Sequence, residues 1–181
     1  MKSFKNYISI SIILIVMVSF MSCEDDNNSQ QDEDVFAGCC SDEPIFGPNV
    51  DNLDHSVGGE ISVSHILTPN GDGFNEFFGV INLDNYPNHT VTIYNYEDQI
   101  VFESSNYVAF ENLFPDVEFA QVNTVYPDGT YKYKIVIEDE QTFTKSGTFC
   151  LYSGNPPIAA EEQNFSECIE AGEFDPILSG F

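Results

Sequence analysis

The segment TYKYKIVIE, residues 130–138, constrains the fold most, because apolar side chains recur in it at every second position. Successive side chains of a β-strand point to opposite faces of the sheet, so this period predicts a strand with one buried face. The residues expected on that face are Tyr131, Tyr133, Ile135 and Ile137. An amphipathic helix would need apolar residues at a period near 3.6. Beyond the amino-terminal apolar run, no stretch sustains such a period between helix-capping residues.

Four further segments between residues 60 and 152 also predict strands. EISVSHIL (60–67) alternates with Ile61, Val63, His65 and Leu67 on one side, and TFTKSGTFCLY (142–152) is another β-rich run. TVTIYN (90–95) and QIVFES (99–104) are separated by only three residues, which suits a hairpin. Strands of this kind bury their aromatic and β-branched side chains by packing one sheet on another, so we expect one antiparallel β-sandwich over residues 60–152.

The amino terminus predicts an export signal. Lys2 and Lys5 precede an apolar run over residues 7–21, which is short for a permanent membrane helix and typical of a signal peptide. Residues 1–22 are therefore expected to be removed. Ser22-Cys23 at the end of the run resembles the lipobox of bacterial lipoproteins, with Phe20 where leucine is usual, and this resemblance implies that Cys23 carries the lipid. An ordinary cleaved signal and a single membrane anchor remain alternatives.

Residues 23–34 form a polar stretch without an apolar side chain, so they are expected to be a solvated, disordered tether. Its acidic start, residues 24–26, resembles the signal that sends lipoproteins of Bacteroidota to the outside of the outer membrane. A plain linker is the alternative. These features together predict an outer-membrane lipoprotein at the cell surface, attached through its acyl chains.

The charge excludes one class of partner. The chain has 30 acidic residues, five lysines, no arginine and a formal net charge of −25, and cleavage after residue 22 would remove two of those lysines. Such a surface repels phosphate backbones and anionic headgroups, so we expect no nucleic acid partner.

Four cysteines besides Cys23 predict disulfides in an oxidising compartment. They are Cys39, Cys40, Cys150 and Cys168. A bond between the neighbours Cys39 and Cys40 would close a strained ring, so we expect each of them to reach one of the other two. That pattern would clamp an amino-terminal strap, residues 35–59, onto a carboxy-terminal extension, residues 153–181. Metal ligation by the four sulfurs is the alternative, although the spacing is a poor zinc signature.

The segment TPNGDGFNE, residues 68–76, concentrates turn residues and oxygen ligands between two apolar runs. Glycines permit positive φ angles and Asn or Asp side chains close turns onto their own backbone, which explains the composition as a structured loop. A second hypothesis is a calcium site, in which Asp72, Asn75 and Glu76 supply oxygens together with backbone carbonyls.

The same region resembles a known family. ILTPNGDGFNEFFGVINLDNYPNHTVTIYNYEDQIVFES, then YPDGTYKYKIVI and GTFCLY, are similar in sequence and order to the gliding motility-associated C-terminal domain of Bacteroidota, the type B sorting domain of the type IX secretion system. The resemblance implies an immunoglobulin-like sandwich, a surface or secreted destination and recognition by export partners rather than catalysis. In the family this domain normally closes the protein, whereas here residues 153–181 follow. We expect them to form a short helix over residues 159–171 and to dock on the sandwich, and an exposed partner-binding motif at residues 175–181 is the alternative.

No catalytic motif stands out, and His55, His65 and His89 are isolated in the sequence. We therefore expect a protein that is not an enzyme, and that acts as an interaction, adhesion or accessory subunit of a surface, secretion or gliding complex. The alternative is a type IX cargo whose sandwich is a sorting signal. A small carboxylate-dependent hydrolase is the most remote hypothesis.

Overall fold

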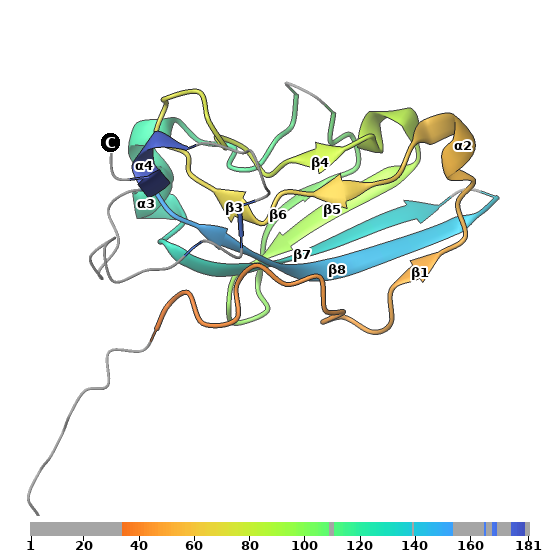
Figure 1. Cartoon of the computed structure of the whole chain (residues 1–181), viewed down its shortest axis with the longest axis horizontal. Helices are drawn as coiled ribbons and strands as arrows, with labels where there is room; N and C mark the ends of the chain where they lie inside the picture. The colour runs from red at the N-terminus through yellow and green to blue at the C-terminus, as the bar shows by residue number, and fades with distance from the viewer. Residues whose placement is uncertain are drawn as a thin grey trace, which may run out of the picture. The chain divides into compact units, whose positions relative to one another are not determined.

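A computed structural model of the chain describes residues 34–108, 111–138, 140–153, 165, 168–169 and 175–179 (Figure 1). The expected signal peptide (1–22), Cys23 and nearly all of the acidic tether (23–34) lie outside the described residues, so they stay predictions. Within the described residues, no helix has the length and apolar character that crossing a membrane requires.

The main sheet is built from four antiparallel strands: β5 (His89–Tyr94), β6 (Ile100–Ser104), β7 (Gly129–Glu138) and β8 (Thr142–Leu151). With the short edge strand β1 (Val50–Asp51), the order is β1-β8-β7-β5-β6. The long β7–β8 hairpin is in register from Gly129 opposite Leu151 to Glu138 opposite Thr142. The alternation predicted for residues 130–138 is confirmed, since the four apolar positions of one face are buried and the lysines between them are half-buried.

The strand expected over residues 60–67 is instead two short strands in two different sheets. β2 (Ser62–Val63) pairs with β4 (Val80–Ile81), whereas β3 (Ile66–Leu67) runs parallel to the end of β8. The chain bends between them at His65, and the Ser64 hydroxyl donates to the Ile66 carbonyl at 3.0 Å. The prediction of one continuous strand was wrong because a strand that changes layers loses its period of two at the corner.

The β2–β4 pair and the loops around it form a second layer over the main sheet, as Figure 1 shows for β4. Aromatic rings fill the space between the layers, with the Phe78 and Phe149 rings 4.6 Å apart and Phe114 and Tyr126 4.7 Å apart. The largest fully buried side chains include Tyr133, Phe78, Phe114, Phe149, Leu83, Ile93 and Ile135. The structure therefore confirms the all-β sandwich predicted from the sequence.

The amino-terminal strap lies along the outer edge of β8. Ser41 and Thr148 exchange two backbone hydrogen bonds, and β1 (Val50–Asp51) pairs antiparallel with the start of β8. This pairing covers backbone groups that an exposed edge strand would otherwise present to other chains.

Helical segments are short and sit in the connections. They are α2 (His55–Gly58), η1 (Leu83–Asn85), η2 (Phe119–Gln121), α3 (Val122–Val125) and α4 (Pro176–Ser179). A helix was also expected over residues 159–171, most of which lie outside the described part. The described residues of that segment, Phe165, Cys168 and Ile169, are not helical.

Candidate interaction surface at the 68–76 loop

The TPNGDGFNE loop leaves β3 and is closed by its own polar groups. The Thr68 N–H donates to the Asn75 carbonyl at 2.8 Å and so joins the two ends. Inside, the Asn70 side chain accepts from the Asp72 N–H and the Asp72 side chain accepts from the Phe74 N–H, both at 2.9 Å. Gly71 has a φ of 85°, which a side chain would disfavour, so the loop conformation requires the turn residues that the sequence supplies.

Glu76 holds the loop from within. The residue is 8% exposed, and its carboxylate accepts the Gly71 N–H at 2.9 Å through Oε2 and the Gly73 N–H at 2.7 Å through Oε1. A charged acceptor for two backbone amides makes a stronger bond than a neutral one. The loop is therefore a preformed surface element.

These bonds bear on the calcium hypothesis for Asp72, Asn75 and Glu76. Both oxygens of Asp72 and both oxygens of Glu76 already accept hydrogen bonds from the loop itself. Among the described residues, the one group of Cys, His, Asp and Glu spaced for a metal is the four cysteines. Calcium binding at the loop stays an untested hypothesis, and the internal hydrogen bonds favour the alternative of a structured loop.

The carboxy-terminal extension contacts the same loop. The Asp175 side chain, 3% exposed, accepts from the Thr68 hydroxyl at 2.5 Å and from the Asn75 amide at 3.0 Å. Asn75, a candidate metal ligand in the sequence, thus binds the carboxy-terminal extension, which we call the tail. The two partners are 100 residues apart in sequence, and no pattern in the sequence signals this contact.

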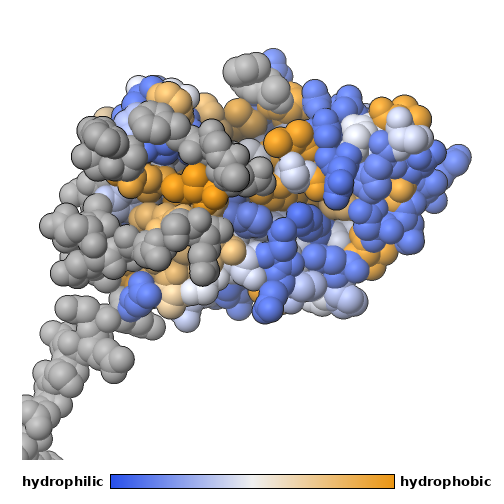
Figure 2. All heavy atoms as spheres, in the orientation of Figure 1, coloured by the Kyte–Doolittle hydropathy of each residue, from blue (hydrophilic) through white to orange (hydrophobic). Residues whose placement is uncertain are grey.

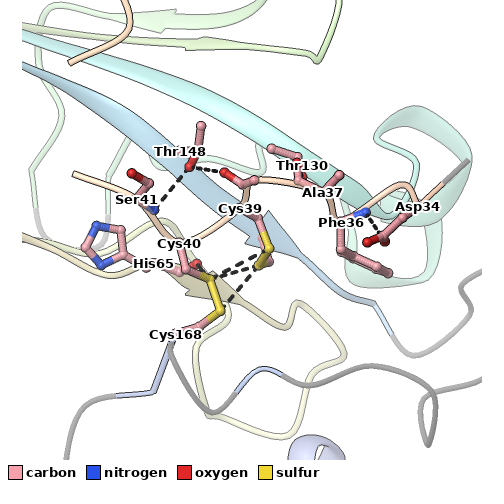
Figure 3. Close-up of a disulfide and its surroundings, with 12 residues drawn as sticks. Asp34, Phe36, Ala37, Cys39, Cys40, Ser41, His65, Thr130, Thr148 and Cys168 are labelled. Atoms are coloured by element: carbon pink, nitrogen blue, oxygen red, sulfur yellow. Dashed lines mark hydrogen bonds between the residues drawn. A yellow bond between two sulfur atoms is a disulfide. The ribbon is translucent and has the colours of Figure 1, made fainter. Parts of the chain in front are cut away.

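The four cysteines meet beside β3, where the strap, β8 and the tail come together (Figure 3). Cys39 is bonded to Cys150 and Cys40 to Cys168. Each strap cysteine thus reaches one of the two later cysteines, the pattern expected from the sequence, and the structure supplies the connectivity that the sequence left open. With all four sulfurs in disulfides, none is a thiolate ligand for a metal.

Three exposed phenylalanines form a feature that the sequence analysis missed. Phe74 and Phe77 come from the loop and its exit, and Phe119 comes from η2; they are 37–41% exposed. The Phe77 and Phe119 rings lie 5.8 Å apart, and a Cβ on Gly71 would come within 3.3 Å of the Phe119 ring. We call Phe74, Phe77 and Phe119 the phenylalanine patch. The run FNEFF could have signalled it, because only Phe78 of its three aromatic residues is turned into the core.

An open groove of 510 Å³ borders the phenylalanine patch. Its apolar lining is Phe77, Leu113, Pro115, Val117 and Phe119, and its acidic members are Asp116 and Glu118. Figure 2 shows apolar atoms gathered on the side of the domain where α3 and α4 lie, and mostly hydrophilic atoms around α2 and β1. An exposed apolar surface with a polar rim is typical of a protein interaction site.

The histidines occupy separate structural positions. His55 lies 2.9 Å from both carboxylate oxygens of Asp51, and His65 lies 3.2 Å from Asp42. Buried His89 accepts the Tyr107 N–H through Nε2 at 3.0 Å. These contacts give each histidine a structural role. They do not test whether the protein is an enzyme, and the expectation that it is not stays a prediction.

Comparison with known proteins identifies one family. Residues 61–151, half of the chain, match the family model described as CHU_C type IX secretion signal domain. No curated protein and no solved structure matches the chain significantly. The matched range contains the loop, the phenylalanine patch and the groove, but neither the strap cysteines nor the tail.

Proposed function

The chain belongs to the CHU_C type IX secretion signal domain family, and from this premise we propose that it is a cargo of type IX secretion whose sandwich is the sorting signal. The observation that carries the proposal is the family match over residues 61–151, which spans both layers of the sandwich. Of the three hypotheses from the sequence, this match favours the cargo over the accessory or adhesion subunit.

The contact surface that we propose is the phenylalanine patch with its groove. Aromatic side chains dominate the binding energy of many interfaces, and burying one phenylalanine contributes on the order of 1.5–3 kcal/mol. Glu76 and the turns fix the loop before any partner arrives, so little conformational entropy is lost on binding. Asp116 and Glu118 at the groove and the charge of −25 favour a partner with basic residues around an apolar centre.

The lipid at Cys23 is compatible with this role and belongs to the same proposal. Export by the type IX machinery would carry the sandwich across the outer membrane, and the acyl chains at Cys23 would then hold the protein at the cell surface. The acidic tether would separate the sandwich from the lipid headgroups.

The test is the location of a reporter inserted between residues 33 and 34 of the full chain, in cells with and without a working type IX machinery. We expect the reporter to be open to added protease on intact competent cells and protected in the machinery-deficient strain. Equal exposure in both strains, or retention in the periplasm in both, would contradict the proposal.

The surface is tested by Phe77→Ala with Phe119→Ala in the same reporter chain. We expect this pair to lower surface exposure of the reporter several-fold, because the partner loses both aromatic contacts. Tyr96→Ala is the matched control, since Tyr96 is an exposed aromatic on the β5–β6 turn, outside the patch. Equal export of Phe77→Ala/Phe119→Ala and Tyr96→Ala would mean that the recognition surface lies outside the phenylalanine patch.

A further inference from the structure

The loop buries the carboxylate of Asp175. Two side-chain donors of the loop, the Thr68 hydroxyl and the Asn75 amide, converge on Oδ2 of Asp175, while its Oδ1 accepts the Ile177 N–H at 3.1 Å. Thr68 is fully buried and Asp175 is 3% exposed, so water has little access to this contact. A carboxylate is costly to bury without hydrogen bonds, and the loop supplies them.

The tail that carries Asp175 is fixed at two further points. Cys168 is bonded to Cys40 of the strap, and the Phe165 ring packs edge-on against Phe36 with 5.2 Å between centroids. Ile177 and Leu178 join the same apolar cluster. The tail therefore docks through a covalent bond, an apolar cluster and one carboxylate.

We propose that Thr68 and Asn75 form a carboxylate-binding site in the loop, that the chain's own Asp-Pro-Ile-Leu segment fills this site, and that the Cys40–Cys168 disulfide decides whether it stays filled. The ligand class is a side-chain carboxylate on an apolar peptide. Reduction of the disulfide by a dithiol transfers two electrons and two protons, leaves two thiols at Cys40 and Cys168, and converts the dithiol to its own disulfide.

The disulfide matters because it makes docking intramolecular. A tethered ligand, here the segment with Asp175, acts at a high effective concentration at its site. This effective concentration falls when the nearby Cys40–Cys168 bond is broken. Cys39 and Cys40 are both half-buried, whereas Cys168 is 7% exposed and Cys150 is 0% exposed, so a small dithiol can reach the Cys40–Cys168 bond somewhat more readily than the Cys39–Cys150 bond. The tail would then depend on its apolar cluster and carboxylate alone.

We call the Cys40–Cys168 disulfide, together with the contact of Asp175 with Thr68 and Asn75, the latch. The strap stays attached to the sandwich when the latch opens. Cys39 remains bonded to Cys150, which lies on β8. The freed Cys40 sulfur lies 3.0 Å from the Cys150 sulfur, and attack there would form Cys40–Cys150 and release the Cys39 thiolate without net oxidation or reduction. Either outcome keeps the strap on the sandwich and leaves Cys168 free.

The latch adjoins the surface proposed for sorting, and its regulatory consequence rests on that proposed function. Cys168, Asn75 and Phe77 line one pocket of 220 Å³, so the tail and the phenylalanine patch share a boundary. The family match ends at residue 151, before the tail begins. The latch is thus an addition of this chain to the family domain, and opening it would uncover the loop for a partner.

Hydrogen exchange on the purified full chain tests the latch without any export assay. We expect the peptide spanning residues 68–76 to exchange about tenfold faster in Cys40→Ser/Cys168→Ser than in the oxidised wild type, because local opening governs exchange. Asp175→Ala should also speed this exchange while its disulfide remains intact. Titrating the wild type with dithiothreitol should reproduce the effect of the double variant.

The control is Cys39→Ser/Cys150→Ser, which removes the other disulfide and keeps the latch. Its loop should exchange at the wild-type rate, and protection of residues 129–138 verifies that each variant is folded. Unchanged loop exchange in both Cys40→Ser/Cys168→Ser and Asp175→Ala would overturn the latch. The reporter assay is read separately, so machinery-dependent export with no change in exchange would overturn the latch alone and leave the sorting function standing.

Discussion

The carbonyl oxygen of Ser41 in the strap lies directly against Gly147 of β8, where a Cβ atom would overlap it and would also come within 2.8 Å of the Tyr133 hydroxyl. Ser41 and the neighbouring Thr148 exchange two backbone hydrogen bonds, so the strap cannot move away without losing them. Position 147 therefore requires glycine, because the strap backbone approaches β8 too closely for a Cβ atom.

We expect Gly147→Ala to lower the free energy of unfolding by about 2–3 kcal/mol, because the new methyl group forces either the strap or Tyr133 to shift. Urea denaturation followed by fluorescence measures the change. Val57→Ala, at a position 90% exposed, is the control and should stay within about 0.5 kcal/mol of the wild type. An unchanged midpoint for Gly147→Ala would mean that the strap does not lie on β8 in solution.

Glu76 gives a second prediction, on the rigidity of the loop. Glu76→Gln places an amide where a carboxylate oxygen accepts a backbone N–H, so one of the two bonds is lost and a donor faces a donor. We expect a loss of roughly 1.5–3 kcal/mol in unfolding free energy, the usual range for a bond to a charged group. Glu97→Gln on the exposed β5–β6 turn is the matched control. Equal midpoints for the two variants would show that Glu76 does not close the loop.

Much of the sandwich could be predicted because its long strands carry a strict period. Tyr131 and Tyr133 turn to the core and the lysine between them does not, so β7 could be recognised without any partner strand. The corner at residues 64–65 could not be recognised, because the alternation of residues 60–67 is the pattern of a single strand and does not show that the chain changes sheets. The local sequence pattern predicts the secondary structure of a segment, but not the sheet to which that segment belongs.

The site was less predictable, for a physical reason. The sequence located the loop through its turn chemistry, and it indicated that the tail would dock. It did not indicate that Asn75 would bind Asp175, because a contact across 100 residues leaves no periodic trace. Phe77 and Phe78 are neighbours in the apolar run after the loop, and the sequence does not distinguish the exposed Phe77 from Phe78, which faces the core.

Calcium offers a third prediction. The loop oxygens of Asp72 and Glu76 already accept internal hydrogen bonds, so we expect the thermal midpoint to be the same with millimolar calcium as with chelator. Binding to the native state at about a hundredfold excess over Kd would add a few kcal/mol and raise the midpoint by several degrees. Such a rise, abolished by Asp72→Ala, would establish the calcium site instead.

The last prediction concerns acid and Asp42, which anchors the strap to β7 and β8. Its carboxylate accepts from the Tyr133 hydroxyl at 2.8 Å and lies 3.1 Å from the Lys145 ammonium. Partial burial raises the pKa of Asp42, but the hydrogen bonds from Tyr133 and Lys145 and the charges of Lys145 and His65 outweigh it and bring the pKa below its usual value. The charged form is therefore favoured in the folded protein relative to the unfolded chain.

A lowered folded pKa fixes the sign of the pH dependence. Asp42 contributes its full stability above the unfolded pKa, near 3.8, and this contribution is lost as the pH falls through the lower folded pKa. We expect the wild type to lose more unfolding free energy between pH 5 and pH 3 than Asp42→Asn, which cannot titrate, with urea midpoints as the measurement. Asp84→Asn, at an exposed carboxylate, should follow the wild type. If Asp42→Asn and the wild type lose stability in parallel over this range, the ion pair with Lys145 and the bond from Tyr133 do not hold the strap in solution.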